Sequence, residues 1–193
     1  MGTDLNAEIL QNDYVIISYN EKDSKTAKQI LDKFSEIVSQ VNRKVGFYDV
    51  PIVQLTLTAS KKEFNEYRDL AILPENSVAI AMPTLSKIII QNPKNLPPHN
   101  DFYQILTHEY LHLMLHSIAN EQNVPLWFAE GFVQYFAGQW NLQREITFVT
   151  EAIKGNSLFL SSYTYHYPES EKKIEMFYLQ SYYTFICTSF KHW

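Results

Sequence analysis

Two histidines and a glutamate stand at metal-site spacing in the segment His108 to His112, which reads His-Glu-Tyr-Leu-His. On an α-helix, residues four positions apart lie on the same face, so both imidazoles can reach one cation. Neutral imidazole is a favoured ligand of zinc. Glu109 lies about a hundred degrees around the helix from His108, too far to compete as a ligand but close enough to touch a water on the ion. The pattern therefore predicts a zinc site with a base beside it.

A third ligand is predicted in the next helix, which begins after a short connection. Residues 125–131 read Pro-Leu-Trp-Phe-Ala-Glu-Gly, and a helical hairpin would bring Glu130 back to face the histidines. Glu130 stands among apolar residues, where a carboxylate is costly to bury unless it meets a cation. Glu121 is the competing ligand, but it lies in a polar connecting segment, where a capping or solvated role is usual. The alternative to a metal site is a helix with scattered surface histidines, or one satisfied core histidine beside a salt-bridged glutamate.

Together the two segments resemble a known family. The pairing of HEYLH with PLWFAEGFVQYF resembles the gluzincin metallopeptidases, and specifically the peptidase-MA-like domains, whose HExxH helix is followed by a P-x-W-x-x-E-G helix. The likeness extends less specifically to PIVQLTLTASKKEF at 51–64 and to Tyr-Leu-Gln-Ser at 178–181. Two departures stand out. The interval to Glu130 is slightly shorter than in thermolysin-like relatives, and such domains often continue with more helix beyond the position of Trp193.

The resemblance implies a ligand set and a mechanism. His108, His112 and Glu130 are expected to bind one Zn²⁺, and Glu109 is expected to be the catalytic base. Three protein ligands leave a fourth position for water, whose pKa zinc lowers toward about 7. Glu109 would take the proton as the water attacks a peptide carbonyl and deliver it to the leaving amine. The expected activity is therefore that of a zinc metallopeptidase acting on a peptide or protein.

The donor that stabilises the tetrahedral oxyanion is less defined. Gluzincins often use a tyrosine or a histidine, and the candidates here are Tyr178, Tyr182, Tyr165 and His166. Tyr178 is favoured because it belongs to the stretch that resembles the family, although a tyrosine at helical spacing is also typical of an aromatic core. His116, four residues after His112, is expected to be an outer-shell or surface histidine.

Two other functions remain open from the sequence. One is a catalytically silent zincin-like domain that serves as a binding or structural module. The other is a zinc-dependent hydrolase that cleaves a non-peptide amide at the same centre. The intact His108, Glu109, His112 and Glu130 argue against a degenerate site. The sequence does not indicate the substrate preference, endo- or exopeptidase cleavage, or the oligomeric state.

The pattern of apolar residues predicts an α+β fold of the zincin-like type in a single domain, 1–193. A small mixed sheet with helices is expected at about 12–95, followed by a helical zinc-binding part at about 100–193 that is C-terminally incomplete. Strands are predicted at 14–19, 51–58, 77–82 and 87–91, and irregular structure at 155–168. Helices are predicted at 23–41, from 61 with Ser60 as its cap, from Asn100 or Asp101 to 118, from Pro125 to before Gly138, and at 171–191.

The strand Lys87–Gln91 leads directly to the zinc helix. If it forms the edge of the sheet, an extended peptide could pair with it and lie across the metal. The alternative is an internal strand, because the run Ile88-Ile89-Ile90 has the pattern of a strand buried on both faces.

Composition excludes several other classes. The formal net charge is −5 and no lysine or arginine cluster appears, so nucleic-acid binding is not expected. The sequence contains no run of about 18 apolar residues, so no transmembrane segment is predicted. Cys187 is the single cysteine, so an internal disulfide cannot form. The first residues lack the pattern of a signal peptide, but an exported protein with its signal removed would look the same, which leaves the localisation open.

Overall fold

The computed structural model describes residues 7–71, 73–98, 100–120 and 122–189. Over these residues the fold is α+β, as predicted, with a five-stranded mixed sheet and six α-helices. The chain forms two compact units, the first ending at residue 121 and the second beginning at residue 122. No helix in the described ranges is both long enough and apolar enough to cross a membrane.

The sheet of the first unit has the strand order β1-β2-β3-β5-β4. Its strands are β1 (Ala7–Gln11), β2 (Val15–Asn20), β3 (Val53–Thr58), β4 (Ala79–Met82) and β5 (Lys87–Gln91). The central strands β2, β3 and β5 run parallel, and β1 and β4 pair antiparallel at the two edges. β5 is therefore an internal strand, which confirms the alternative drawn from its isoleucine run and makes the edge-strand prediction wrong.

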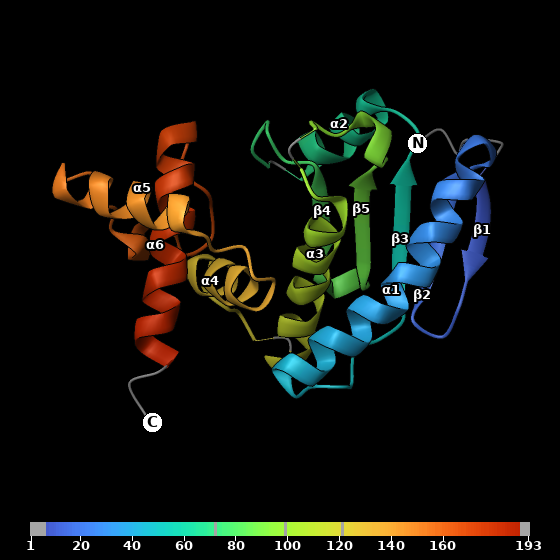
Figure 1. Cartoon of the computed structure of the whole chain (residues 1–193), viewed down its shortest axis with the longest axis horizontal. Helices are drawn as coiled ribbons and strands as arrows, with labels where there is room; N and C mark the ends of the chain where they lie inside the picture. The colour runs from blue at the N-terminus through green and yellow to red at the C-terminus, as the bar shows by residue number, and fades with distance from the viewer. Residues whose placement is uncertain (1–6, 72, 99, 121, 190–193) are drawn as a thin grey trace. The chain divides into compact units, whose positions relative to one another are not determined.

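Three helices cover the two faces of this sheet (Figure 1). The long helix α1 (Ser24–Val45) and α3 (Phe102–Ile118) contact each other and the strands on one face. The shorter α2 (Lys61–Leu70) packs on the other face, where Phe64 meets Ile80 and Ile89. Since neighbouring residues of a strand point to opposite faces, Ile88 and Ile90 face the α1/α3 side, and all three isoleucines are buried.

The ends of α2 and α3 follow the capping residues named from the sequence. The Ser60 side chain accepts a hydrogen bond from the backbone N–H of Glu63, and the Asp101 carboxylate accepts from those of Tyr103 and Gln104. Such caps satisfy N–H groups that have no partner within the helix. Asp101, rather than Asn100, therefore fixes where the histidine-bearing helix begins.

The second unit is helical and contains an element that the sequence analysis did not predict. It consists of α4 (Leu126–Phe136), α5 (Leu142–Ile153) and α6 (Glu171–Ser189), with a short 3₁₀ turn at Leu160–Tyr163. α5 is the unpredicted helix, and the 3₁₀ turn lies within the stretch expected to be irregular. The last residues of the helix predicted to reach 191 lie outside the described residues.

A close approach between α4 and α6 sets the geometry of this unit. Gly131 lies in the middle of α4, and a Cβ atom placed on it would stand 2.3 Å from the backbone oxygen of Ser181 and 2.6 Å from Cβ of Phe185. Only glycine fits there. Because Gly131 follows Glu130 directly, this packing also fixes the position of the predicted ligand.

Candidate metal centre

The first part of the candidate site is the histidine pair on α3. Tyr110 and Leu111 lie between the two histidines in sequence and point into the core, where they are 1% and 0% exposed. The Tyr110 hydroxyl donates a hydrogen bond to Oδ1 of Asn42 on α1 at 2.9 Å. These buried contacts fix the rotation of α3 about its axis, so His108 and His112 share a partly exposed side of the helix.

The two imidazoles approach each other through the same ring nitrogen. Nε2 of His108 and Nε2 of His112 are 3.2 Å apart, and the ring centroids are 4.9 Å apart. Zinc binds histidine nitrogen at about 2.0–2.1 Å, so two nitrogens of a tetrahedral site stand about 3.3 Å from each other. The observed separation matches that edge length. One ring can also donate to the other, depending on which tautomers are present.

The imidazole of His112 is held in its neutral form, which can bind a cation. Protein atoms surround its imidazole although the residue keeps some exposed surface, and this desolvation lowers the pKa of His112 to about 4 from the ordinary value of 6.5. Burial disfavours the charged form of a histidine, so the ring is neutral at pH 7. A neutral imidazole keeps a lone pair for a metal, and no proton has to be displaced first.

The second part of the candidate site is Glu130 on α4, which is 1% exposed. The Tyr167 hydroxyl, from the irregular segment before α6, donates to Oε1 of Glu130 at 2.5 Å. One turn further along α4, the Gln134 amide donates to the backbone oxygens of Glu130 and Tyr178. In turn, Arg144 donates to Oε1 of Gln134 at 2.6 Å. Tyr167 therefore contacts the carboxylate itself, while the bonds of Gln134 link the α4 backbone beside it to α5 and α6.

One ligand atom from each of His108, His112 and Glu130 lies within 4.8 Å of the other two. Two imidazoles and one carboxylate form a donor set suited to a catalytic zinc ion, which uses three protein ligands. Glu109 follows His108 on α3 and is partly exposed. Glu121, the competing ligand considered from the sequence, lies outside the described residues.

The predicted oxyanion donors are found in different surroundings. Tyr178 is partly exposed, with its ring centroid 6.0 Å from that of Tyr167. Tyr182 stacks flat on Trp140 at 4.0 Å, as part of an aromatic cluster. Tyr165 is 79% exposed, and His166 is also exposed.

Tyr167 is the residue that sequence analysis missed. It belongs to the aromatic run 164–167, which was expected to be irregular, and its distance of 37 positions from Glu130 gave no reason to pair the two. The only signal was that Tyr167 lies one and two residues away from two other candidates, His166 and Tyr165.

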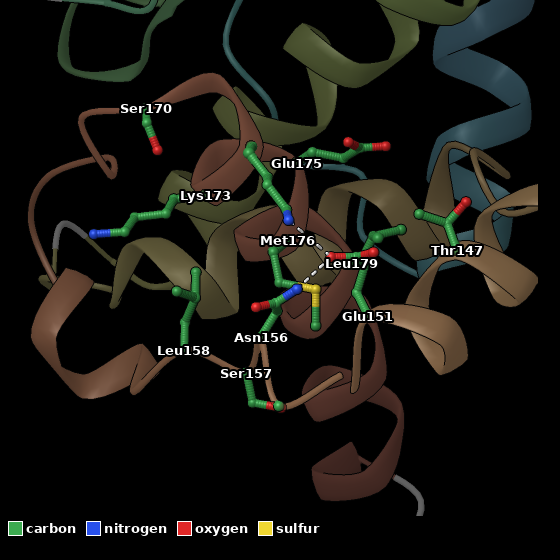
Figure 2. Close-up of a pocket in the computed structure, with 12 residues that line it drawn as sticks. Thr147, Glu151, Asn156, Ser157, Leu158, Ser170, Lys173, Glu175, Met176 and Leu179 are labelled. Carbon is green, nitrogen blue, oxygen red and sulfur yellow. Dashed lines mark hydrogen bonds and ion pairs between the residues drawn. The ribbon is translucent and has the colours of Figure 1, made fainter. Parts of the chain in front are cut away.

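A separate cavity of about 590 Å³ opens in the second unit among α5, the turn at 155–158 and the start of α6 (Figure 2). Glu151 lines this cavity and has a shifted pKa. Its carboxylate accepts hydrogen bonds from Lys154 and Asn156 and pairs with Lys172. The bond from Lys154, followed by that from Asn156, lowers the pKa of Glu151 to about 2. The negative charge of Glu151 is thus balanced by its lysine partners. None of the three candidate metal ligands lines the cavity.

No protein-family model matches the chain, and a search of curated proteins finds none with significant sequence similarity.

Proposed function

We propose that the chain is a zinc-dependent metallopeptidase with a zincin-like fold of the gluzincin type. The observation that carries the proposal is the approach of three ligand atoms, one each from His108, His112 and Glu130, to within 4.8 Å of one another. The resemblance of HEYLH and PLWFAEGFVQYF to the peptidase-MA-like domains supports it independently of that geometry.

In this proposal His108, His112 and Glu130 would hold one Zn²⁺. The histidines come from one helix whose buried side is fixed by Tyr110, so little reorganisation is needed to present both rings. Tyr167 orients the Glu130 carboxylate through the bond to Oε1, as outer-shell partners commonly do for metal ligands. A bound zinc ion supplies a Lewis acid that acidifies water and polarises a carbonyl.

Glu109 is the general base of the proposed reaction. It stands about a hundred degrees around α3 from His108, which keeps it out of the ligand set but beside the place where water would attack. Its carboxylate accepts one proton from the attacking water as the new C–O bond forms. The same proton then passes to the amine nitrogen as the C–N bond breaks, which returns Glu109 to its starting state.

Tyr178 keeps its proposed role as the oxyanion donor. Its ring lies beside that of Tyr167, and Tyr167 contacts Glu130, which supports a position near the reacting carbonyl. Removing one oxyanion donor typically lowers kcat by about 100- to 1,000-fold. Tyr178→Phe separates this role from simple packing, because phenylalanine keeps the ring and removes only the hydroxyl.

The proposal is tested by zinc analysis combined with cleavage of a peptide library, read by mass spectrometry. The wild-type chain is expected to bind one zinc ion and cleave peptides. Glu109→Gln should retain zinc and lose cleavage by at least about 100-fold, since it removes only the base. Glu130→Ala should lower zinc affinity. His116→Gln is the matched control, because it changes a histidine one turn further along α3 that is not a proposed ligand.

Each outcome has a defined meaning. Zinc binding without cleavage of any peptide would favour a silent binding or structural module. Cleavage of non-peptide amides alone, abolished by Glu109→Gln, would favour the other hydrolase. A chain that binds no zinc at neutral pH would overturn the proposal.

A further inference from the structure

Helix α5 carries its large aliphatic residues on the side that faces solvent. Four of them form a continuous row, defined here as the α5 stripe: Leu142, Ile146, Val149 and Ile153, which are 71%, 52%, 48% and 82% exposed. Their spacing of four, three and four positions places them along one side of the helix. Isolated exposed aliphatic residues are common on proteins, but a contiguous row over the whole length of a helix marks an interaction site.

The opposite side of α5 already has partners, so the exposed stripe does not belong to a loosely placed helix. Phe148 stacks on Tyr183 with the ring centroids 4.1 Å apart. Arg144 donates to Gln134 from the same side, and Glu151 is held by Lys154 and Asn156. α5 is thus fixed by its polar and aromatic side and presents its aliphatic side outward.

The stripe is symmetric about its own centre. Reversing the direction of α5 brings Leu142 opposite Ile153 and Ile146 opposite Val149, so a second copy related by a two-fold axis presents an aliphatic partner at every position. Alternating steps of three and four residues are also the spacing at which two helices interlock along a narrow seam.

The residues beside the stripe are also compatible with a second copy of the chain as the partner. The flanking positions are Gln143, Glu145, Thr150 and Ala152, and an antiparallel pairing sets the single charge, Glu145, near neutral residues of the other copy. Helices that bind anionic membranes carry lysine or arginine beside the apolar side. Here Arg144 points toward Gln134, and Lys154 pairs with Glu151.

We propose that the α5 stripe is a homodimer interface in which two copies of the chain pair their α5 helices antiparallel. A helix of 12 residues is about 18 Å long, so the contact is small. Pairing would remove on the order of 1,000 Å² from water over both copies, near the lower limit of specific interfaces. The dimer is therefore weak, with a dissociation constant in the micromolar range or above.

Sedimentation equilibrium from low micromolar to several hundred micromolar protein tests the association. The wild-type chain should shift from monomer to dimer over this range, and Ile146→Asp should raise the dissociation constant at least about 10-fold, since it places a charge in the seam. Leu70→Asp is the matched control, because Leu70 is 79% exposed on α2, outside the stripe. A wild-type chain that stays monomeric throughout, or equal effects of the two variants, would overturn the proposal.

Cysteine cross-linking tests the direction of the pairing. In a Cys187→Ser background, which removes the exposed native thiol, Leu142→Cys and Ile153→Cys are prepared as separate proteins. An antiparallel pair brings residue 142 of one copy to residue 153 of the other, so only the mixture should form a disulfide-linked dimer. If each variant cross-links with itself as readily as the mixture does, or if the chain binds vesicles through this face instead, the proposed interface is wrong.

Discussion

Gly131 offers the sharpest test of how the second unit places Glu130. Changing it to alanine adds a Cβ atom 2.3 Å from the backbone oxygen of Ser181 and 2.6 Å from Cβ of Phe185. Ordinary contact begins at 3.4 Å, so α4 and α6 must separate locally by about 1 Å. Neither colliding atom lies at the end of a flexible side chain, and therefore no rotamer change relieves the contact.

The two physical effects of this substitution have opposite signs. In the interior of an exposed helix, alanine stabilises by about 1 kcal/mol relative to glycine. Overpacking a tight interface costs about 1–3 kcal/mol and occasionally more. With two contacts under 3.0 Å, the steric cost should exceed the helix propensity. We therefore expect Gly131→Ala to lower the free energy of unfolding of the second unit by about 1–2 kcal/mol.

The same shift should weaken metal binding. Glu130 is adjacent to Gly131 and moves with α4, while the Tyr167 hydroxyl that orients it comes from a different segment. Disturbing the support of a metal ligand typically costs 10- to 100-fold in affinity. We expect zinc affinity to fall within that range, while the geometry of the histidine pair on α3 stays unchanged.

Both quantities can be measured on the same samples. All three tryptophans of the chain, at positions 127, 140 and 193, belong to the second unit, so tryptophan fluorescence during urea unfolding reports on that unit. Competition with a chromophoric chelator gives the zinc affinity. Gly155→Ala is the control, because Gly155 has a φ of +76° and open space around its Cβ position. It should cost about 1–2 kcal/mol through the backbone alone and leave zinc affinity unchanged.

Two results would refute this reasoning in different ways. A more stable Gly131→Ala variant would show that α4 and α6 do not approach as closely as described. A less stable variant with unchanged zinc affinity would confirm the close packing of α4 and α6 but would show that Glu130 is not a zinc ligand.

Two further predictions concern groups around the site and the separate cavity. Tyr167→Phe removes the donor to Glu130 and should lower zinc affinity about 10-fold; unchanged affinity in the chelator competition would contradict the orienting role. Lys154→Ala should raise the pKa of Glu151 from about 2 toward its ordinary 4.5, measured by NMR titration of the carboxyl carbon. Because that pKa is lowered in the folded state, the stability contributed by Glu151 is present above pH 4.5 and lost as the pH falls toward 2. The stability difference between wild type and Glu151→Gln should shrink over that interval, and a constant difference would contradict it.

The local features of the fold could be predicted from sequence because they depend on neighbours in the chain. The histidine pair follows from a spacing of four on a helix, and its Nε2 atoms are 3.2 Å apart. The caps at Ser60 and Asp101 depend on the next three residues. The isoleucine run gave the alternative that β5 is internal, and the structure confirms it: the three residues are buried and the strand pairs on both sides.

The two elements that were missed, β1 and α5, are mostly exposed. β1 has mostly exposed residues and pairs only at the edge of the sheet, so no alternation marks it. α5 does carry a helical signal in its sequence, and none of its residues is buried. Its aliphatic residues do recur at helical spacing, but they face solvent. An apolar row normally indicates the side of a helix that meets the core, and here it lies on the exposed side of α5.

The two halves of the candidate site therefore differ in what fixes them. The imidazoles are fixed within one helical turn, and any sequence that keeps α3 helical keeps their spacing. The carboxylate depends on contacts between distant segments: Tyr167, 37 positions away, donates to it, and Gln134 on the same helix reaches the backbone of Tyr178 across 44 positions. The position of the carboxylate is consequently the feature of the site that is most sensitive to substitutions elsewhere in the chain. Substitutions that loosen α4 from α6 should affect zinc affinity well before they disturb the histidines, although none of them touches the metal.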